Sequence, residues 1–120
     1  MSRQRKFIIV KDWSGKDIQI RIGYPIFHRD LLDKSDEKNN IDCYGGGRWD
    51  LDYENKTITL YGSSDDFGNP NKNDIEIAIK NLDDHAYWQL EWMMERIFDK
   101  EFPDRDYSDL KDYKFIINYD

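Results

Sequence analysis

The feature that most constrains the fold of this chain is a two-residue alternation of apolar side chains on either side of a short polar turn. Apolar side chains stand at every second position of two neighbouring segments: Trp49, Leu51 and Tyr53, then Ile58 and Leu60. The polar residues 54–56 separate the two segments. Period-two alternation gathers apolar side chains on one face of a β-strand. Residues 48–53 and 57–61 therefore predict an antiparallel hairpin within a sheet.

Further strands are predicted at both ends of the chain. Residues 7–10 form a β-branched apolar run, which suits a strand buried on both faces. Isoleucines alternate with polar residues over 18–22, and Ser14-Gly15 supplies a turn between these two segments, so a second hairpin is expected. Residues 41–53 read as extended, and residues 114–119 predict a last strand.

Two helices are expected in the second half of the chain. The first spans 73–82 with Asn73 as its N-cap, although the isoleucines at 75, 77 and 79 also fit a strand. The second runs from Asp83-Asp84 to about 102 and ends at Pro103. Its residues at helical spacing form a broad apolar stripe: Ala86, Leu90, Met93, Met94, Ile97 and Phe98, with Tyr87 at the edge.

The remaining segments divide into short helical turns and loops. Residues 27–34 predict one to three helical turns, whereas the polar stretch 35–40 and residues 62–71 predict loops. A chain of 120 residues fits a single domain over 1–120. The expected fold is α/β (α+β), a mixed sheet flanked by helices.

Composition narrows the function classes. The formal net charge of −7 repels nucleic-acid phosphates, and the densest basic cluster is only Arg3, Arg5 and Lys6, so no nucleic-acid role is expected. The single cysteine, Cys43, excludes an intramolecular disulfide and a cysteine-rich zinc site. No apolar run reaches membrane-spanning length, and the N-terminus lacks a signal-peptide pattern. A cytoplasmic protein without a membrane role is therefore expected.

Three motifs follow one another along the chain. Residues 27–34 read FHRDLLDK, residues 43–48 read CYGGGR, and residues 60–68 read LYGSSDDFG. In this order they resemble the phosphohistidine phosphatase (Janus/Ocnus) family, which carries aromatic-His-x-Asp-aliphatic-x-Asp-Lys, Cys-x-Gly-Gly-Gly-Arg and Tyr-Gly-x-Ser-x-x-aromatic-Gly segments. The resemblance spans residues 27–82, and the segment 83–107 matches nothing recognised in the family, so its helix is interpreted as an insertion.

The resemblance implies a Janus/Ocnus-like mixed sheet and a phosphatase that needs no metal or cofactor. It assigns His28 as base or phosphoryl acceptor. It also assigns a phosphate-holding role to the loop containing Ser64 and the amides of Asp65 and Asp66. The implied substrate is a phosphorylated protein or a small phosphoramidate such as phosphohistidine. Asp65 and Asp66 replace uncharged residues of the family pattern.

Other residues of the motifs leave more than one role open. The resemblance implies an active-site lysine on the first strand, for which Lys6 and Lys16 compete. Arg48 is either a phosphate ligand or an ion-pair partner, and Cys43 is expected to be an inert strand thiol. The three glycines at 45–47 are interpreted as structural, allowing the His28 segment to pack closely against a strand.

Each of these sites also has a simpler interpretation. His28 could serve only to bond a backbone group, and His85 is expected to be an ordinary first-turn helix residue. Asp30, Asp65, Asp66 and His28 could hold a divalent cation, but aspartates on the surface of an acidic chain are the commoner case.

Trp88 and Trp92 lie four residues apart, opposite the apolar stripe of their predicted helix. An exposed tryptophan pair would indicate a surface for a protein partner or for a homodimer. Alternatively, the C-terminal loop covers them. The sequence therefore supports two functions, a phosphatase and a non-catalytic member of the same fold that binds a partner protein through this helix.

Overall fold

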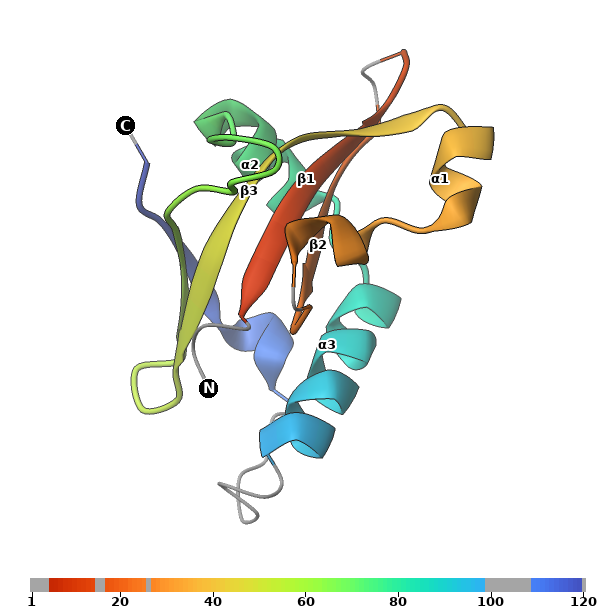
Figure 1. Ribbon diagram of the computed structural model, residues 1–120. Coiled ribbons are helices and arrows are strands. Elements are labelled where there is room, and N and C mark those ends of the chain that lie inside the picture. Colours follow the sequence, from red (N-terminus) through yellow and green to blue (C-terminus); the bar gives the residue numbers. More distant parts are fainter. Residues whose placement is uncertain (1–4, 15–16, 26, 99–108, 120) are drawn as a thin grey trace.

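The computed structural model describes residues 5–14, 17–25, 27–98 and 109–119 of the chain (Figure 1). A five-stranded sheet has the order β2-β1-β3-β4-β5. Its strands are β1 (Lys6–Asp12), β2 (Ile18–Gly23), β3 (Ile41–Asp52), β4 (Thr57–Tyr61) and β5 (Lys114–Ile117). The helical elements are η2 (His28–Leu31), α1 (Lys34–Lys38), α2 (Lys72–Lys80), α3 (Asp84–Phe98) and the 3₁₀ turn η3 (Leu110–Asp112).

Strand pairing confirms the mixed α+β fold and both predicted hairpins. β1 pairs antiparallel with β2, and the second half of β3 pairs antiparallel with β4 in the register Trp49↔Leu60 and Leu51↔Ile58. β5 lies parallel to β4 and closes the far edge of the sheet. Both the predicted strand at 7–10 and the predicted strand at 114–119 exist, although the second ends at Ile117.

Each face of the sheet is covered by a different set of elements. Phe7 and Ile9 of β1 belong to the main core, together with Trp49 and residues from α2, α3 and η3. Ile8 is also fully buried but lies outside that cluster, because successive side chains of a strand point to opposite faces. The segment containing η2 covers Ile8 on the second face, which is the face that carries the candidate site.

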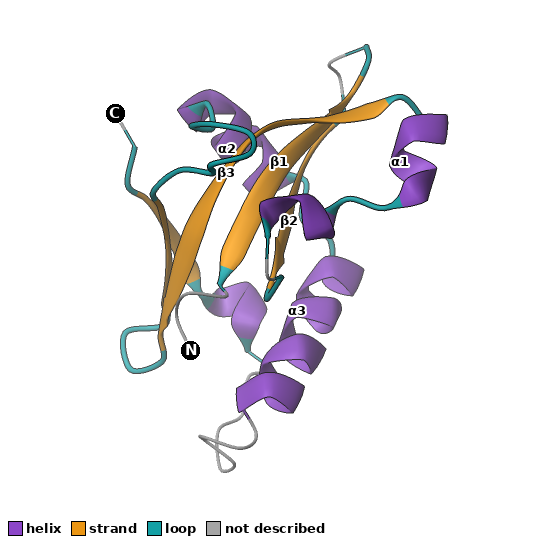
Figure 2. Ribbon diagram, in the orientation of Figure 1, coloured by secondary structure: helices purple, strands orange, loops and turns teal. Residues whose placement is uncertain are grey.

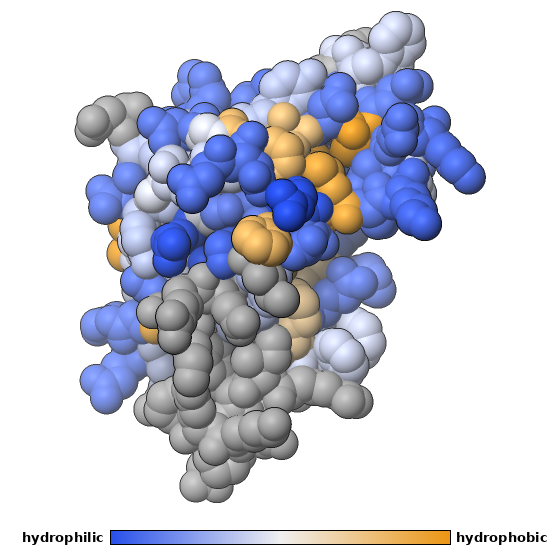
Figure 3. All heavy atoms as spheres, in the orientation of Figure 1, coloured by the Kyte–Doolittle hydropathy of each residue, from blue (hydrophilic) through white to orange (hydrophobic). Residues whose placement is uncertain are grey.

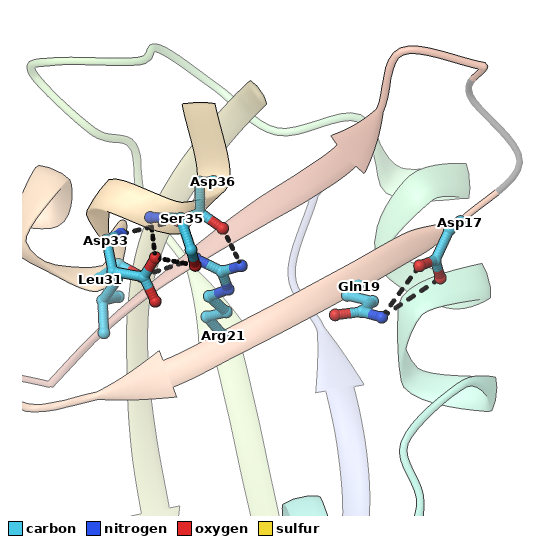
Figure 4. Close-up of polar contacts among 7 residues, drawn as sticks. All are labelled: Asp17, Gln19, Arg21, Leu31, Asp33, Ser35 and Asp36. Carbon is cyan, nitrogen blue, oxygen red and sulfur yellow. Dashed lines mark hydrogen bonds and ion pairs between the residues drawn. The ribbon is translucent and has the colours of Figure 1, made fainter. Parts of the chain in front are cut away.

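The loop predicted over 35–40 is wrong, because α1 forms there. The Asp33 side chain caps this helix by accepting from the amide of Ser35. The Asp36 carboxylate in turn accepts from the Asp33 amide at 2.7 Å. Arg21 of β2 donates to both carboxylate oxygens of Asp36, at 2.7 and 2.6 Å (Figure 4). This tertiary partner, 15 residues away along the chain, stabilises a helix that is too short to form alone.

Other predicted boundaries shift. α2 is helical, which excludes the strand alternative for its isoleucines, and its N-cap is Asn71 rather than Asn73. The Asn71 side chain accepts from the amides of Asn73 and Asp74. Residues 27–34 are helical only in η2 and at the start of α1. α3 reaches Phe98, and the predicted continuation to 102 lies outside the described residues.

None of the helices in the described part of the chain is both long enough and apolar enough to cross a membrane.

The Arg21–Asp36 pair generates a test of stability against pH. Asp36 is 4% exposed, and its bond to Arg21 lowers the pKa of its carboxyl. A lowered folded-state pKa stabilises the fold above the unfolded pKa of about 4, and this stabilisation is lost as the pH falls through the folded value. We expect Asp36→Asn to lower the free energy of unfolding at pH 7 by about 2 kcal/mol.

Urea unfolding of both proteins between pH 7 and pH 2 measures this difference, which should narrow as the wild-type carboxylate becomes protonated. Glu37→Gln is the matched control, because Glu37 lies next to Asp36 in α1 but is exposed. A stability difference that stays constant with pH, or an equal loss in the Glu37 variant, would contradict the assignment.

Candidate functional site

His28 lies buried against the glycines of β3. The residue is 6% exposed, and its Nε2 lies 2.8 Å from the carbonyl oxygen of Gly47. A carbonyl oxygen can only accept, so Nε2 carries a proton, and in the neutral ring Nδ1 keeps its lone pair. The bond to Gly47 thus fixes one tautomer of the neutral ring and leaves Nδ1 as its basic nitrogen.

The close packing of His28 depends on the absence of a side chain at Gly46. A Cβ built on Gly46 would lie 2.6 Å from the carbonyl oxygen of Phe7 and 3.0 Å from Cδ2 of His28. The pairing of β1 with β3 also shifts register between Ile8 and Val10, beside these glycines. The prediction that the glycine run lets the His28 segment pack closely is confirmed.

The loop after β4 lies beside the same part of β3 (Figure 2). The amide of Gly46 donates to the carbonyl oxygen of Gly68 at 3.2 Å, which joins the loop to the strand. Within the loop, Ser64 is 4% exposed, and its Oγ accepts from the amides of Asp66 and Phe67 at 3.2 and 3.1 Å. The Asp66 amide that the family resemblance assigns to phosphate is thus bonded to Ser64 here.

Two cations occupy directly opposite positions on neighbouring strands. Lys6 of β1 pairs with Arg48 of β3. Burial, and the charge of Arg48, lower the pKa of the Lys6 ammonium, while the carboxylate of Asp30 acts in the other direction. Lys6 Nζ also donates to the carbonyl oxygen of Pro25 at 3.4 Å, which brings it to the segment preceding His28. The competing candidate, Lys16, lies outside the described residues.

A third cation connects η2 with the loop. Arg29, the residue after His28, lies with Nη1 3.9 Å from the carboxylate of Asp66. This pair is partly exposed, since the side chains of Arg29 and Asp66 retain 61% and 33% exposure. No local pattern predicts this pair, because the two residues belong to different motifs. The side chain of Asp65 is exposed at the same loop.

The site therefore brings together parts of all three sequence motifs. His28 and the 62–68 loop bond to the carbonyl of Gly47 and the amide of Gly46, respectively, while Arg48 follows Gly47 on β3 and Arg29 follows His28 on η2. Figure 3 shows this face of the molecule, where hydrophobic side chains gather near the centre and hydrophilic ones border them. The position of Lys6 depends on the register of β1 with β3, a long-range pairing that no local pattern in the sequence encodes.

The Cys43 thiol and a metal site are the two other candidates that the sequence raised. Burial raises the pKa of the Cys43 thiol, and its Sγ donates to the carbonyl oxygen of Gly45 at 3.4 Å, both of which favour an inert thiol. Among the described residues, no three side chains of the His, Cys, Asp and Glu types converge as metal ligands would.

The predicted partner surface lies on α3. Trp88 is 58% exposed and Trp92 is 47% exposed, whereas Leu90 and Met94 on the opposite side of the helix are buried. The ring of His85 stacks on Trp88 with 6.0 Å between centroids. The two tryptophans are thus exposed, as the first of the two interpretations expects. The C-terminal loop, which the second interpretation placed over them, lies mostly within residues 99–108, outside the described part.

The range matched by a protein-family model covers most of the candidate site. A family model described as Ocnus, the Janus/Ocnus family, matches residues 9–89, which is more than half of the chain. The matched range includes His28, the glycine run and the 62–68 loop, and it also reaches into the first turns of α3. The expectation that the segment 83–107 has no family counterpart is therefore wrong for residues 83–89. No significant match is found among curated proteins.

The dependence of the site on Gly46 generates a second prediction. Gly46→Ala should lower the free energy of unfolding by about 2 kcal/mol, because its Cβ meets a rigid carbonyl group and the His28 ring. It should also move the ring resonances of His28 in an NMR spectrum. Gly23→Ala is the control, since its Cβ would approach the flexible Leu31 side chain at 3.1 Å. Equal effects of the two substitutions would show that Gly46 does not position the ring.

Proposed function

Because the chain belongs to the Janus/Ocnus family, we propose that it is a metal-independent phosphatase that acts on a phosphoryl group bonded to nitrogen, as in phosphohistidine. His28 is the catalytic residue of this proposal. The observation that carries it is the position of His28, a buried imidazole held in one tautomer beside two cations that face each other across neighbouring strands.

The fixed tautomer of His28 suits either of two roles. With Nε2–H bonded to Gly47, the lone pair of Nδ1 can remove a proton from an attacking water molecule. The same lone pair can instead attack phosphorus, which breaks the P–N bond of the substrate and releases its nitrogen group. Water then removes the phosphoryl group from Nδ1 as phosphate in a second step. Both roles leave the Gly47 bond in place to hold the ring, and the Gly47 carbonyl stabilises positive charge that develops on it.

Lys6 and Arg48 supply the charge that a phosphoryl group requires. Like charges directly opposite on neighbouring strands destabilise a sheet, and the charge of Arg48 contributes to the lowered pKa of Lys6. A phosphoryl group near both side chains would relieve this repulsion. It would also gain stabilisation as negative charge builds on its oxygens in the transition state.

Asp65 and Asp66 of the 62–68 loop lower the affinity of the site for a phosphoryl group. A carboxylate about 5 Å from a phosphoryl oxygen costs roughly 1 to 3 kcal/mol, depending on the local dielectric. Arg29 lies 3.9 Å from the Asp66 carboxylate and offsets part of its charge. Asp65 is exposed, where solvent screens it. The site is therefore expected to bind free phosphate weakly and to select substrates through contacts beyond the phosphoryl group.

A third prediction tests His28 against the other histidine of the chain. His28→Ala should lower kcat/KM for hydrolysis of a chemically phosphorylated histidine peptide by about a hundredfold to ten-thousandfold. His85→Ala should leave the rate unchanged, because His85 is exposed on α3. EDTA should also have no effect, since the proposed chemistry uses side chains of this chain alone. Activity that survives His28→Ala but disappears with EDTA would reverse the assignment in favour of a metal site.

The exposure of Trp88 and Trp92 favours a second candidate function, that of a partner-binding module without catalysis. Two large aromatic side chains exposed on one helix are typical of the centre of a protein interface. This function would use α3 and would not require His28. It would agree with the same fold, because a fold does not determine activity.

A fourth prediction addresses this surface. If a second copy of the chain binds there, changing Trp88 and Trp92 to Gln should leave the chain folded and shift a concentration-dependent dimer toward monomer in sedimentation. Gln suits this test because both side chains are exposed and lie away from the core. Loss of folding would show instead that the pair contributes to the core. A mass that does not change with the substitutions would contradict self-association through α3.

A further inference from the structure

The outer edge of β2 borders a groove that the proposed phosphatase chemistry does not use. β2 is the terminal strand of the sheet, and α3 lies beside it (Figure 1). The groove has a volume of ≈ 340 Å³, within the range of ligand-binding pockets. It is lined by residues 19–22 of β2, by Leu31 of η2, and by the face of α3 that carries Tyr87, Leu90 and Met93.

The register of the first hairpin shows which backbone groups face this groove. The amide of Asp12 donates to the carbonyl oxygen of Asp17, so these two residues form a hydrogen-bonded pair. Bonded pairs recur at every second residue of an antiparallel ladder, which directs Gln19 and Arg21 toward β1. The amides and carbonyls of the alternate residues, Ile18, Ile20 and Ile22, therefore face outward.

A side chain elsewhere in the fold supports this assignment. Asn81, at the end of α2, donates from Nδ2 to the carbonyl oxygen of Ile18 at 2.8 Å, which occupies one outward group. In the described part of the chain, no hydrogen bond reaches the outward amides and carbonyls of Ile20 and Ile22. An edge with unpaired backbone groups is a template for the addition of an extended strand.

Charges around the groove indicate the chemistry of the added strand. Asp17, Asp83 and Asp84 are exposed beside the lining residues. Among the described residues that line the groove, only Arg21 is charged. Asp36 and the carbonyl oxygen of Leu31 already bind its guanidinium (Figure 4). A segment with apolar side chains at alternate positions and lysine or arginine at its ends would complement this surface. A second copy of the chain, with a net charge of −7, would be repelled.

We propose that β2 and α3 form a docking groove for an extended, positively charged peptide segment of a partner protein, which adds to the sheet beside β2. Its backbone bonds the outward groups of Ile20 and Ile22. Its apolar side chains pack against Leu31, Leu90 and Met93 in the groove. The docking groove does not depend on the phosphatase activity, because it includes neither His28 nor the 62–68 loop.

The experiment uses the full chain and a blocked heptapeptide, acetyl-Lys-Val-Thr-Val-Thr-Val-Lys-amide. Saturating peptide should move the amide resonances of Ile20 and Ile22 and slow their hydrogen exchange. N-methylation removes an amide donor, and alternate amides of a strand face opposite sides. Two further peptides, one methylated on its Val nitrogens and one on its Thr nitrogens, should therefore differ in affinity. One of them should bind at least about tenfold more weakly than the unmethylated peptide, while the other should retain its affinity.

Two matched charge variants test the acidic rim. Asp83→Asn with Asp84→Asn removes two charges beside the groove, and Asn retains the ability to cap the Ala86 amide as Asp83 does now. This variant should bind the peptide about threefold to tenfold more weakly at low salt. The control, Asp42→Asn with Glu54→Gln, removes two exposed charges on β3 and its following turn, and it should bind as the wild type does.

Three results would overturn the proposal. The first is that saturating peptide leaves the amide resonances and the hydrogen exchange of Ile20 and Ile22 unchanged. The second is an equal loss of affinity in both charge variants, which would indicate attraction to the net charge rather than to the groove. The third is protection of these amides that rises with protein concentration without peptide, together with a doubled mass in sedimentation, which would make a second copy the occupant.

Discussion

The arrangement of the site depends on the close approach that two adjacent glycines of β3 allow. The amide of Gly46 bonds the 62–68 loop, and the carbonyl of Gly47 bonds His28, so one short backbone segment holds both elements. A side chain at Gly46 would meet the carbonyl oxygen of Phe7 at 2.6 Å as well as the His28 ring. Position 46 therefore requires glycine for space. Position 45 also requires glycine because its φ is positive, at 128°.

The opposite face of the same strand joins the site to the core of the fold. Trp49 is fully buried in the core, and its indole Nε1 donates to the carbonyl oxygen of Gly23 at 3.1 Å. Tyr119, beyond β5, donates its hydroxyl to the carbonyl oxygen of Gly62 at 2.6 Å, and burial raises the pKa of that hydroxyl. The C-terminal residues thus hold the first residue of the loop that carries Ser64. Core packing and the candidate site are therefore coupled through β3.

α3 presents different chemistry on each of its sides. Leu90 and Met94 are buried against the core, while Trp88 and Trp92 are exposed on the opposite side. Leu90 also belongs, with Tyr87 and Met93, to the wall that the helix forms in the groove beside β2. A single amphipathic helix therefore supports the sheet and leaves two surfaces accessible, neither of which includes His28 itself.

Much of the fold was readable from the sequence, because side-chain periodicity is a local property. The alternation over 48–61 determined its hairpin, and the apolar stripe beginning at Ala86 determined α3. The motif containing His28 indicated the family and the candidate residue before any geometry was known. The same local argument failed for α1, because that helix depends on the bond from Arg21 to Asp36, which no periodicity encodes.

The tertiary structure alone decided which groups meet. The sequence left Lys6 and Lys16 as competing candidates. The antiparallel register of β1 with β3 places Lys6 opposite Arg48, whereas Lys16 lies outside the described residues. The tertiary structure likewise brings Arg29 to Asp66, and it leaves the outward backbone groups of Ile20 and Ile22 facing the groove. Periodicity determines which side of a strand or helix is apolar. Strand order, register and distance between motifs depend on the packing of the whole chain, which residues far apart in the sequence determine together.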